Sequence, residues 1–175
     1  RPVQEALSRL LAAHHPYPGL VLDRQWNVVL ANDAAMAMAA WIPAALREPR
    51  LNVYRATLHP DGLSRLTVNF AEWASHLLGN LRRSIEVSGD PALIALEREV
   101  LDYPNVRAVL QAPVSAPAPA LLVPQVMDSP LGRLSLFTTL TSFGTPRDVT
   151  LEELCVELFY PADEATADTL RATGT

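Results

Sequence analysis

The sequence contains no lysine, one cysteine and no long uninterrupted apolar run. All 14 basic residues are arginine, so neither a lysine Schiff base nor the phosphate-binding lysine of a P-loop can form. The single Cys155 excludes an intrachain disulfide and a CxxC motif, and it favours a reducing compartment. The apolar stretches are too short or too interrupted by proline to cross about 30 Å of hydrocarbon. We therefore expect a cytoplasmic protein with no membrane partner.

Catalytic signatures are also missing. No G-x-S-x-G nucleophile elbow, no HExxH zinc motif and no G-x-G-x-x-G phosphate loop occurs. His14 and His15 are adjacent, so their side chains point apart and make a poor metal site. The sequence thus predicts no catalytic residue, no metal site and no cofactor. An enzyme, for example one that processes lipids, is the least favoured functional class.

The composition is that of a globular protein. Hydrophobic residues make up 49% of the 175 residues and charged residues 19%. The net charge is −5 and the arginines are scattered, so the chain has no concentrated basic face and is not expected to bind DNA by itself. At roughly 150 residues per domain, we expect one domain over 1–175, with an N-terminal helix over 2–13 and a core over 16–172.

Hydrophobic periodicity predicts one helix, two strands, a block of helices, three strands and a closing helix. The expected helices cover 2–13, 33–42, 52–58, 70–85, 91–100 and 163–172, and the expected strands cover 20–23, 26–31, 121–127, 134–143 and 151–160. This order predicts an α+β fold, in which a mainly antiparallel five-stranded sheet carries helices packed over one face. Such an arrangement forms a cup.

Local signals refine this picture at the helix starts. Asn32 occupies the position of a helix N-cap, and Asn69 with Glu72 three residues later forms a capping-box pattern. Asp90 followed by proline, and Asp163, are further helix starts.

The strand region has its own signals. Pro124 cannot donate a ladder hydrogen bond, which places its strand at a sheet edge. In the last strand, Glu153 and Glu157 lie on one side and predict a largely polar face, so only one side of the sheet is expected to be fully covered. Three prolines within 111–120 predict a connector.

Bulky side chains suggest walls for a small-molecule pocket, although ordinary core packing is the commoner role for any one of them. They are Trp26, Trp41, Trp73, Met36, Met38, Phe70, Phe137, Phe143 and Phe159. Arg55 is either an exposed surface residue or a guanidinium that binds a ligand carboxylate.

Several stretches resemble the MmyB-like ligand-binding domain of bacterial transcription regulators, over about residues 16–171. They are Tyr17–Asn32 (YPGLVLDRQWNVVLAN), Asn52–Gly62 (NVYRATLHPDG), Asn69–Trp73 (NFAEW), Asp90–Leu93 (DPAL), Leu134–Leu154 (LSLFTTLTSFGTPRDVTLEEL) and Phe159–Asp163 (FYPAD). The resemblance implies a PAS-like fold that cradles an apolar or fatty-acid-like ligand. It also implies an N-terminal Cro-type helix-turn-helix domain, which we expect to be missing from a chain that starts at Arg1.

Three functional hypotheses follow. The first is a sensor that binds an apolar or fatty-acid-like molecule and controls the attached DNA-binding domain; burying about ten methylenes at ~0.8 kcal/mol each makes such binding feasible. The second is an interaction module with a filled core, which forms a homodimer through its sheet or its first helix. The third is an enzyme. The candidate ligand-binding residues are Arg55, Asn32, Asn69, Trp73, Met36, Phe70, Leu77 and Phe137.

Overall fold

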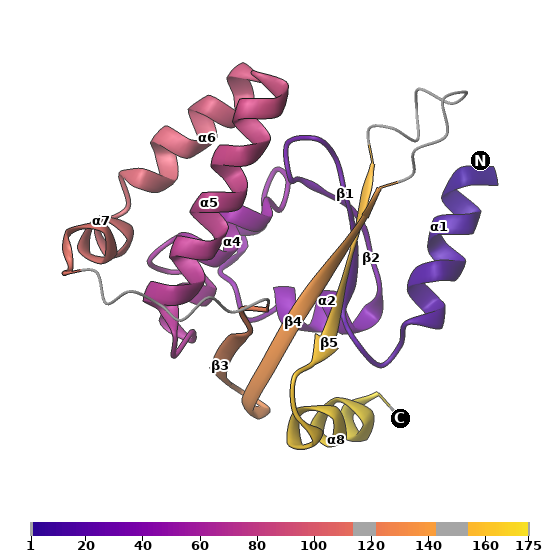
Figure 1. The fold of residues 1–175 in the computed structure, drawn as a ribbon. Coiled ribbons are helices and arrows are strands. Elements are labelled where there is room, and N and C mark those ends of the chain that lie inside the picture. Colours follow the sequence, from indigo (N-terminus) through magenta and orange to yellow (C-terminus); the bar gives the residue numbers. More distant parts are fainter. Residues whose placement is uncertain (1, 114–121, 143–153, 175) are drawn as a thin grey trace.

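The computed structural model describes residues 2–113, 122–142 and 154–174 (Figure 1). Its centre is a five-stranded antiparallel sheet in the order β2-β1-β5-β4-β3. The strands are β1 (Gly19–Leu22), β2 (Val28–Ala31), β3 (Gln125–Ser129), β4 (Gly132–Ser142) and β5 (Cys155–Pro161). The expected α+β class and its five-stranded antiparallel sheet are confirmed.

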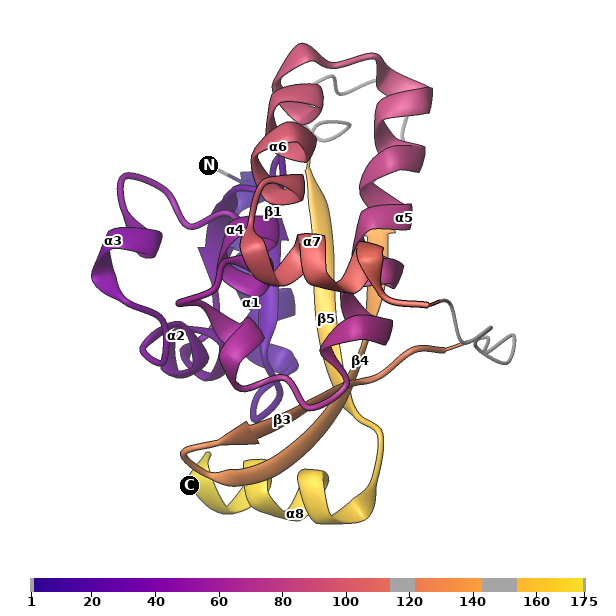
Figure 2. The same cartoon turned by 90° about the vertical axis from the view of Figure 1, so that its left-hand side faces the viewer.

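Most helices form a layer over one face of this sheet. The helices are α1 (Pro2–Ala13), α2 (Asp33–Ala39), α3 (Ala44–Arg47), α4 (Val53–Leu58), the 3-10 turn η1 (Leu63–Arg65), α5 (Phe70–Ser88), α6 (Pro91–Leu101), α7 (Pro104–Gln111) and α8 (Glu164–Thr173). Helix α5 contacts both α6 and α7, and Figure 2 shows these three together in front of β4 and β5. Tyr54, Trp73, Leu81 and Val100 are among the buried residues of this layer.

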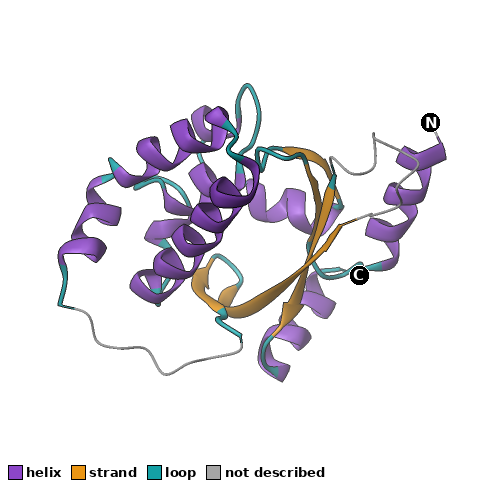
Figure 3. Cartoon of the chain, turned by 45° about the horizontal axis from the view of Figure 1, so that its top comes forward, coloured by secondary structure: helices purple, strands orange, loops and turns teal. Residues whose placement is uncertain are grey.

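Helix α1 covers part of the opposite face. Its buried Leu7 and Leu11 pack against Val21 of β1 and Val156 of β5. Helices therefore lie on both sides of the strands (Figure 3). The apolar side of α1 is used inside the chain, so it is not an unpaired surface in this structure.

The two faces of β5 differ from the sequence interpretation. Val156 and Leu158 pack with α1, whereas Glu157 is buried on the side of the helical layer. The expectation of a polar, partly uncovered face at Glu157 is therefore wrong, because α2, α4 and α5 cover that side. Glu153 lies outside the described residues.

The edge position predicted from Pro124 is confirmed. Strand β3 pairs only with β4 in the sheet order and is an edge strand, and Pro124 immediately precedes it. The strand begins at Gln125, and the described residues 122–124 do not join the ladder. The predicted hairpin of β1 and β2 is also confirmed, with a register shift between Val21 and Leu22.

Three short elements escaped the sequence analysis. Helix α3 and turn η1 are only one turn long, and such segments carry little periodic signal. No helix was expected directly after the one over 91–100, but Tyr103-Pro104 starts α7, with Pro104 in the first turn where its missing N–H costs nothing. Of the expected connector over 111–120, residues 114–120 lie outside the described residues, as does Phe143.

Asparagine side chains fasten two helix starts to the strands. The Asn32 Oδ1 accepts hydrogen bonds from the Ala35 and Gly19 N–H groups, both at 3.0 Å, and its Nδ2 donates to the Tyr17 carbonyl at 2.8 Å. Asn52 caps α4 by accepting from the Tyr54 N–H at 3.1 Å, and its Nδ2 donates to the Gln25 carbonyl at 2.9 Å. The N-cap prediction for Asn32 is confirmed.

Asn69 serves a different purpose from the one expected. Its side chain makes no cap hydrogen bond to α5, so the capping-box prediction is wrong. Instead Oδ1 accepts from the Val126 N–H at 2.9 Å, and Nδ2 donates to the Pro124 carbonyl at 2.7 Å. The amide thus pairs with the backbone of the edge strand, which offers free hydrogen-bonding groups.

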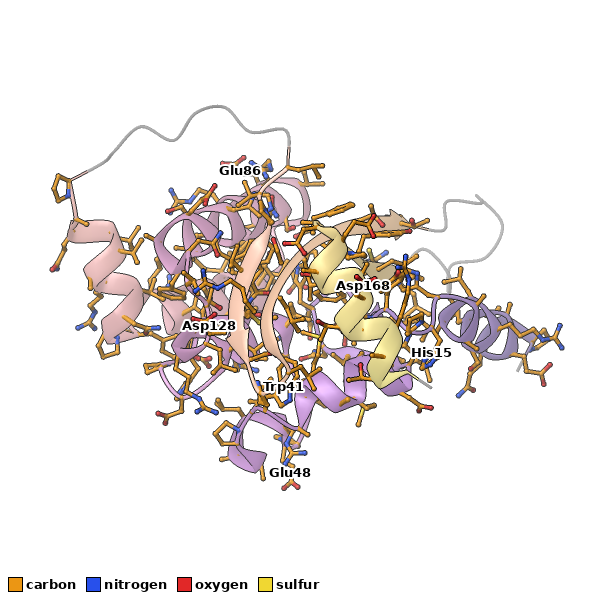
Figure 4. All side chains as sticks on the ribbon, turned by 90° about the horizontal axis from the view of Figure 1, so that it is seen from below. His15, Trp41, Glu48, Glu86, Asp128 and Asp168 are labelled. Atoms are coloured by element: carbon orange, nitrogen blue, oxygen red, sulfur yellow. The ribbon has the colours of Figure 1, made fainter. Side chains whose placement is uncertain are left out.

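The closing helix α8 lies across the strands at the lower end of the sheet, as the view from below in Figure 4 shows. Asp163 is its N-cap and accepts from the Thr166 N–H at 2.7 Å, as expected. At its other end, His15 Nε2 is 2.9 Å from the Gly174 carbonyl oxygen, which ties the two terminal regions together.

The packing of α1 yields a test of stability. Replacing Leu11 with alanine removes a side chain that is only 2% exposed, so we expect a loss of about 2–5 kcal/mol in the free energy of unfolding, measured by urea denaturation. Arg9→Ala, on the exposed side of the same helix, is the matched control and should change stability by less than about 0.5 kcal/mol. Equal effects of both substitutions would mean that α1 is not docked.

Candidate functional site

An apolar cavity lies between the sheet and helices α2, α4 and α5. Its volume is about 70 Å³, and it lies within about 640 Å³ of unfilled space that includes open solvent. Every described strand except β4 contributes to its wall. The lining residues are Pro18, Leu20, Val28, Ala35, Met38, Ala39, Ile42, Leu51, Val53, Ala56, Thr57, Leu63, Trp73, Leu77, Gln125, Glu157 and Phe159.

The hollow exists because small side chains face it from the helices. Ala35 and Ala39 of α2 and Ala56 of α4 are buried and line the cavity. Helix α2 is rich in alanine, which favours helix while contributing only a methyl group to the wall. Leucine at these positions would fill the space, so the alanines keep it open.

Trp73 lines this wall and carries a buried donor without a described partner. Its side chain is 4% exposed, and its Nε1 has no hydrogen-bond partner among the described residues. The indole ring stacks on His76, with ring centroids 5.4 Å apart. Burial lowers the pKa of His76, and the nearby Arg83 lowers it further. A buried, unpaired N–H costs about 1–3 kcal/mol of stability.

Glu157 supplies the second unpaired atom. It lies on the central strand β5, opposite Leu20 of β1 and Leu140 of β4, and its Oε2 has no partner in the described part of the chain. Burial raises the pKa of Glu157 from the ordinary glutamate value to about 7. Near neutral pH the carboxyl group therefore carries a proton for a substantial part of the time.

The Glu157 carboxylate contributes to the pKa shifts of two neighbouring side chains. Burial raises the pKa of Tyr54, and the carboxylate adds to that shift while Arg83 opposes it. Burial and then Glu157 also raise the pKa of the Cys155 thiol. The thiolate is thereby disfavoured, which makes Cys155 a poor nucleophile.

The remaining polar wall is partly committed. The Gln125 side chain donates from Nε2 to Thr67 Oγ1 at 3.1 Å. Glu157 is the only residue with an ionisable carboxyl, amine or guanidinium group among the described residues that line the cavity. The cavity is thus largely apolar, and its described lining residues include a few polar groups and no cationic side chain.

Only part of the predicted site lines this cavity. Trp73 and Leu77, one helical turn apart on α5, both face it. Met38 and Phe159, which were suggested as wall residues, also line it. The helical spacing of α5 was a sufficient signal for the first pair.

Arg55 lies elsewhere. Its Nε donates to Glu99 Oε2 at 2.7 Å, and the Tyr103 hydroxyl donates to the same oxygen at 2.7 Å. Burial raises the pKa of Glu99, but the hydrogen bonds from Arg55 and Tyr103 produce a net lowering. A contact between Arg55 and a ligand stays a prediction.

The other candidates are also outside the cavity wall. Asn32 and Asn69 use their amide groups to hold strands and helix starts together. Met36 is 56% exposed, Phe70 packs on the helical layer, and Phe137 stacks on Tyr160 with ring centroids 5.4 Å apart. Ligand binding by these five residues likewise stays a prediction.

Comparison with known proteins identifies the family. The family model for the MmyB-like transcription regulator ligand binding domain matches residues 3–172. The chain belongs to this family. The resemblance inferred from the sequence stretches is therefore confirmed. No curated protein matches the MmyB-like domain described here.

A solved PAS domain is also similar to this MmyB-like domain. The PAS domain of BvgS from Bordetella pertussis aligns over 99% of this chain and 95% of that chain, with 15% sequence identity and a TM-score of 0.42.

Two further features bear on chemistry. In the described ranges, no group of three or more histidine, cysteine, aspartate or glutamate side chains is arranged to hold a metal ion. None of the described helices of the MmyB-like domain is both long and apolar enough to cross a bilayer.

Sequence reasoning missed Glu157, Gln125 and the three cavity alanines. The signal for Glu157 was its neighbours: Cys155 and Phe159 share its side of β5, and both are less polar than a solvent-facing strand requires. A single carboxylate between them marks a buried position at least as well as an exposed one.

The buried Glu157 yields a pH-dependent test. Since its pKa is raised from 4.5 to about 7, the folded chain retains a proton that the unfolded chain releases. The wild-type protein should therefore lose about 3 kcal/mol of stability as the pH rises through this interval. Urea denaturation of Glu157→Gln should lack this loss.

The control for this test is Glu86→Gln, which removes an exposed carboxylate on α5 (Figure 4). This variant should keep the pH profile of the wild type. If Glu157→Gln also keeps that profile, the carboxyl group is not buried as described.

Proposed function

We propose that this MmyB-like domain is the sensor of a bacterial transcription regulator, and that a small apolar or fatty-acid-like molecule binds in the cavity. One observation carries the proposal: the cavity has apolar walls, and two of its lining residues, Trp73 and Glu157, each carry a buried polar atom without a described partner. A filled core would normally pair or exclude such atoms. Membership of a ligand-binding domain family supports the same conclusion.

The strands offer a route by which ligand binding reaches α1. Leu20 and Glu157 face the cavity and pair with each other across β1 and β5. The next pair along these strands, Val21 and Val156, faces the other side and packs against α1. A ligand that displaces Leu20 and Glu157 therefore also moves the adjacent Val21 and Val156, on which α1 packs.

In this proposal an N-terminal helix-turn-helix domain precedes α1, and the ligand shifts the balance between two arrangements of that domain. The shift requires that the ligand bind the two arrangements with different affinities. DNA is then a partner only through that domain, and the protein acts in the cytoplasm as a binding protein and not as an enzyme. Homodimerisation through the sheet or α1 stays a prediction.

Filling the cavity tests ligand binding directly. Ala39→Leu adds volume to the wall from α2 and should weaken the binding of straight-chain alcohols and fatty acids of six to twelve carbons by at least about tenfold, because the added side chain occupies their space. Isothermal titration calorimetry gives the affinities. Ala37→Leu, on the exposed side of the same helix, is the matched control and should bind as the wild type does.

The bound molecule itself is sought by native mass spectrometry of freshly purified protein, followed by organic extraction. We expect an adduct that dissociates as a small apolar compound and that is reduced in Ala39→Leu. A wild-type protein that carries no adduct and binds none of the probe series contradicts the sensor proposal.

A further inference from the structure

The segment that joins α1 to β1 is hydrogen-bonded to a residue of the cavity wall. This linker covers residues 14–18, between the end of α1 and the start of β1. Phe159 of β5 lines the cavity, and its N–H donates to the Pro18 carbonyl at 3.0 Å. Its own carbonyl oxygen is 2.7 Å from His14 Nε2. One residue of the wall therefore contacts both ends of the linker.

His14 is held by contacts on several sides. A carbonyl oxygen can only accept, so Nε2 carries the hydrogen and donates it to Phe159. The half-buried imidazole also meets Tyr17 and Tyr160 edge-on, with ring centroids 5.8 Å and 5.0 Å away. Its backbone N–H donates to the Leu11 carbonyl at 3.2 Å, which continues the last turn of α1. The place of this turn thus depends on the place of Phe159.

We infer that His14 is the positioning residue through which a ligand in the cavity acts on the last turn of α1. The inference rests on the proposed ligand-binding function, and it names a residue outside the cavity that couples binding to α1. A ligand that displaces Phe159 also displaces its backbone carbonyl and the adjacent Tyr160, and both of these contact His14. The hydrogen bond from His14 is then lengthened or lost, and the turn is released from the sheet.

The neighbouring His15 makes a similar contact that does not lead to the cavity. Its Nε2 is 2.9 Å from the Gly174 carbonyl oxygen, and Figure 4 shows His15 close to α8. No residue of α8 is among the described residues that line the cavity. Only the His14 contact therefore ends on a residue of the wall, and His15 is a matched control.

The experiment measures hydrogen exchange of the backbone N–H groups at positions 14 and 15, which donate to the Leu11 and Ala12 carbonyls. Each protein is compared free and saturated with 1-octanol. The ratio of the loaded to the free rate cancels the effect of a substitution on intrinsic exchange. In the wild type, 1-octanol should speed exchange at least about fivefold, because release of the turn makes local opening easier.

Three variants separate coupling from packing. His14→Phe keeps an aromatic ring but removes the donor, so the ratio should fall below about twofold while the affinity for 1-octanol stays within about threefold of the wild type. His14→Gln carries an amide N–H donor of similar reach and should restore the wild-type ratio. His15→Phe should also keep that ratio. A purely structural role of His14 would alter the free-state rate of His14→Phe and leave its ratio unchanged.

The outcomes distinguish this inference from the proposed function. If 1-octanol binds the wild type but leaves exchange in α1 unchanged, the inference is overturned while ligand binding stands. The same holds if His14→Phe keeps the wild-type ratio, or if His15→Phe loses it as fully as His14→Phe does.

Two provisions keep the test decisive. If His14→Phe does not fold, His14→Asn takes its place and should show the same loss, because its amide ends one bond short of the Nε2 position. If 1-octanol does not bind the wild type, octanoate is the probe. If calorimetric titration shows binding of neither, the inference and the proposed function both fail.

Discussion

The cavity depends on the way the helical layer is attached to the sheet. A helix that is held only by apolar packing settles onto the strands until the space between them is filled. Here Asn32 joins the start of α2 to Gly19 and Tyr17, and Asn52 joins the start of α4 to the β1–β2 loop. These directional bonds tie each helix start to the strands, and the buried alanines that follow add only methyl groups to the cavity wall. Asn69 adds a similar tie between α5 and β3.

The raised pKa of Glu157 follows from its burial between the sheet and the helical layer. In the central strand of a sheet covered on both sides, a carboxyl group has no access to bulk water, and burial alone accounts for its raised pKa. A chain that keeps such a group loses stability near neutral pH unless something else contacts it. The unpaired indole N–H of Trp73 in the same wall carries a similar cost. Two such costs in one cavity are more readily understood in a binding site than in a core.

The family is one of ligand-binding domains, but the charged group in the cavity wall differs from the one that the sequence suggested. The resemblance implied an apolar or fatty-acid-like ligand, and Arg55 was the natural partner for a carboxylate. In the structure that guanidinium is paired with Glu99, and the wall carries an acidic group instead of a basic one. The chemistry of the wall therefore depends on which side of α4 and β5 faces inward, and residue type alone does not determine this.

The sequence by itself determined the elements and much of their order, because periodicity, N-caps and prolines act over a few residues. The five strands, the start of α2 at Asn32, the edge position of β3 and the cavity-facing pair of Trp73 and Leu77 all follow from such local signals. Tertiary structure decided what faces what. Burial of Glu157, the docking of α1 on Val21 and Val156, and the use of Asn69 by β3 each require residues far apart in the chain to meet. Local patterns do not predict these long-range contacts, since a strand with one carboxylate has the same alternation whether water or a helix covers it.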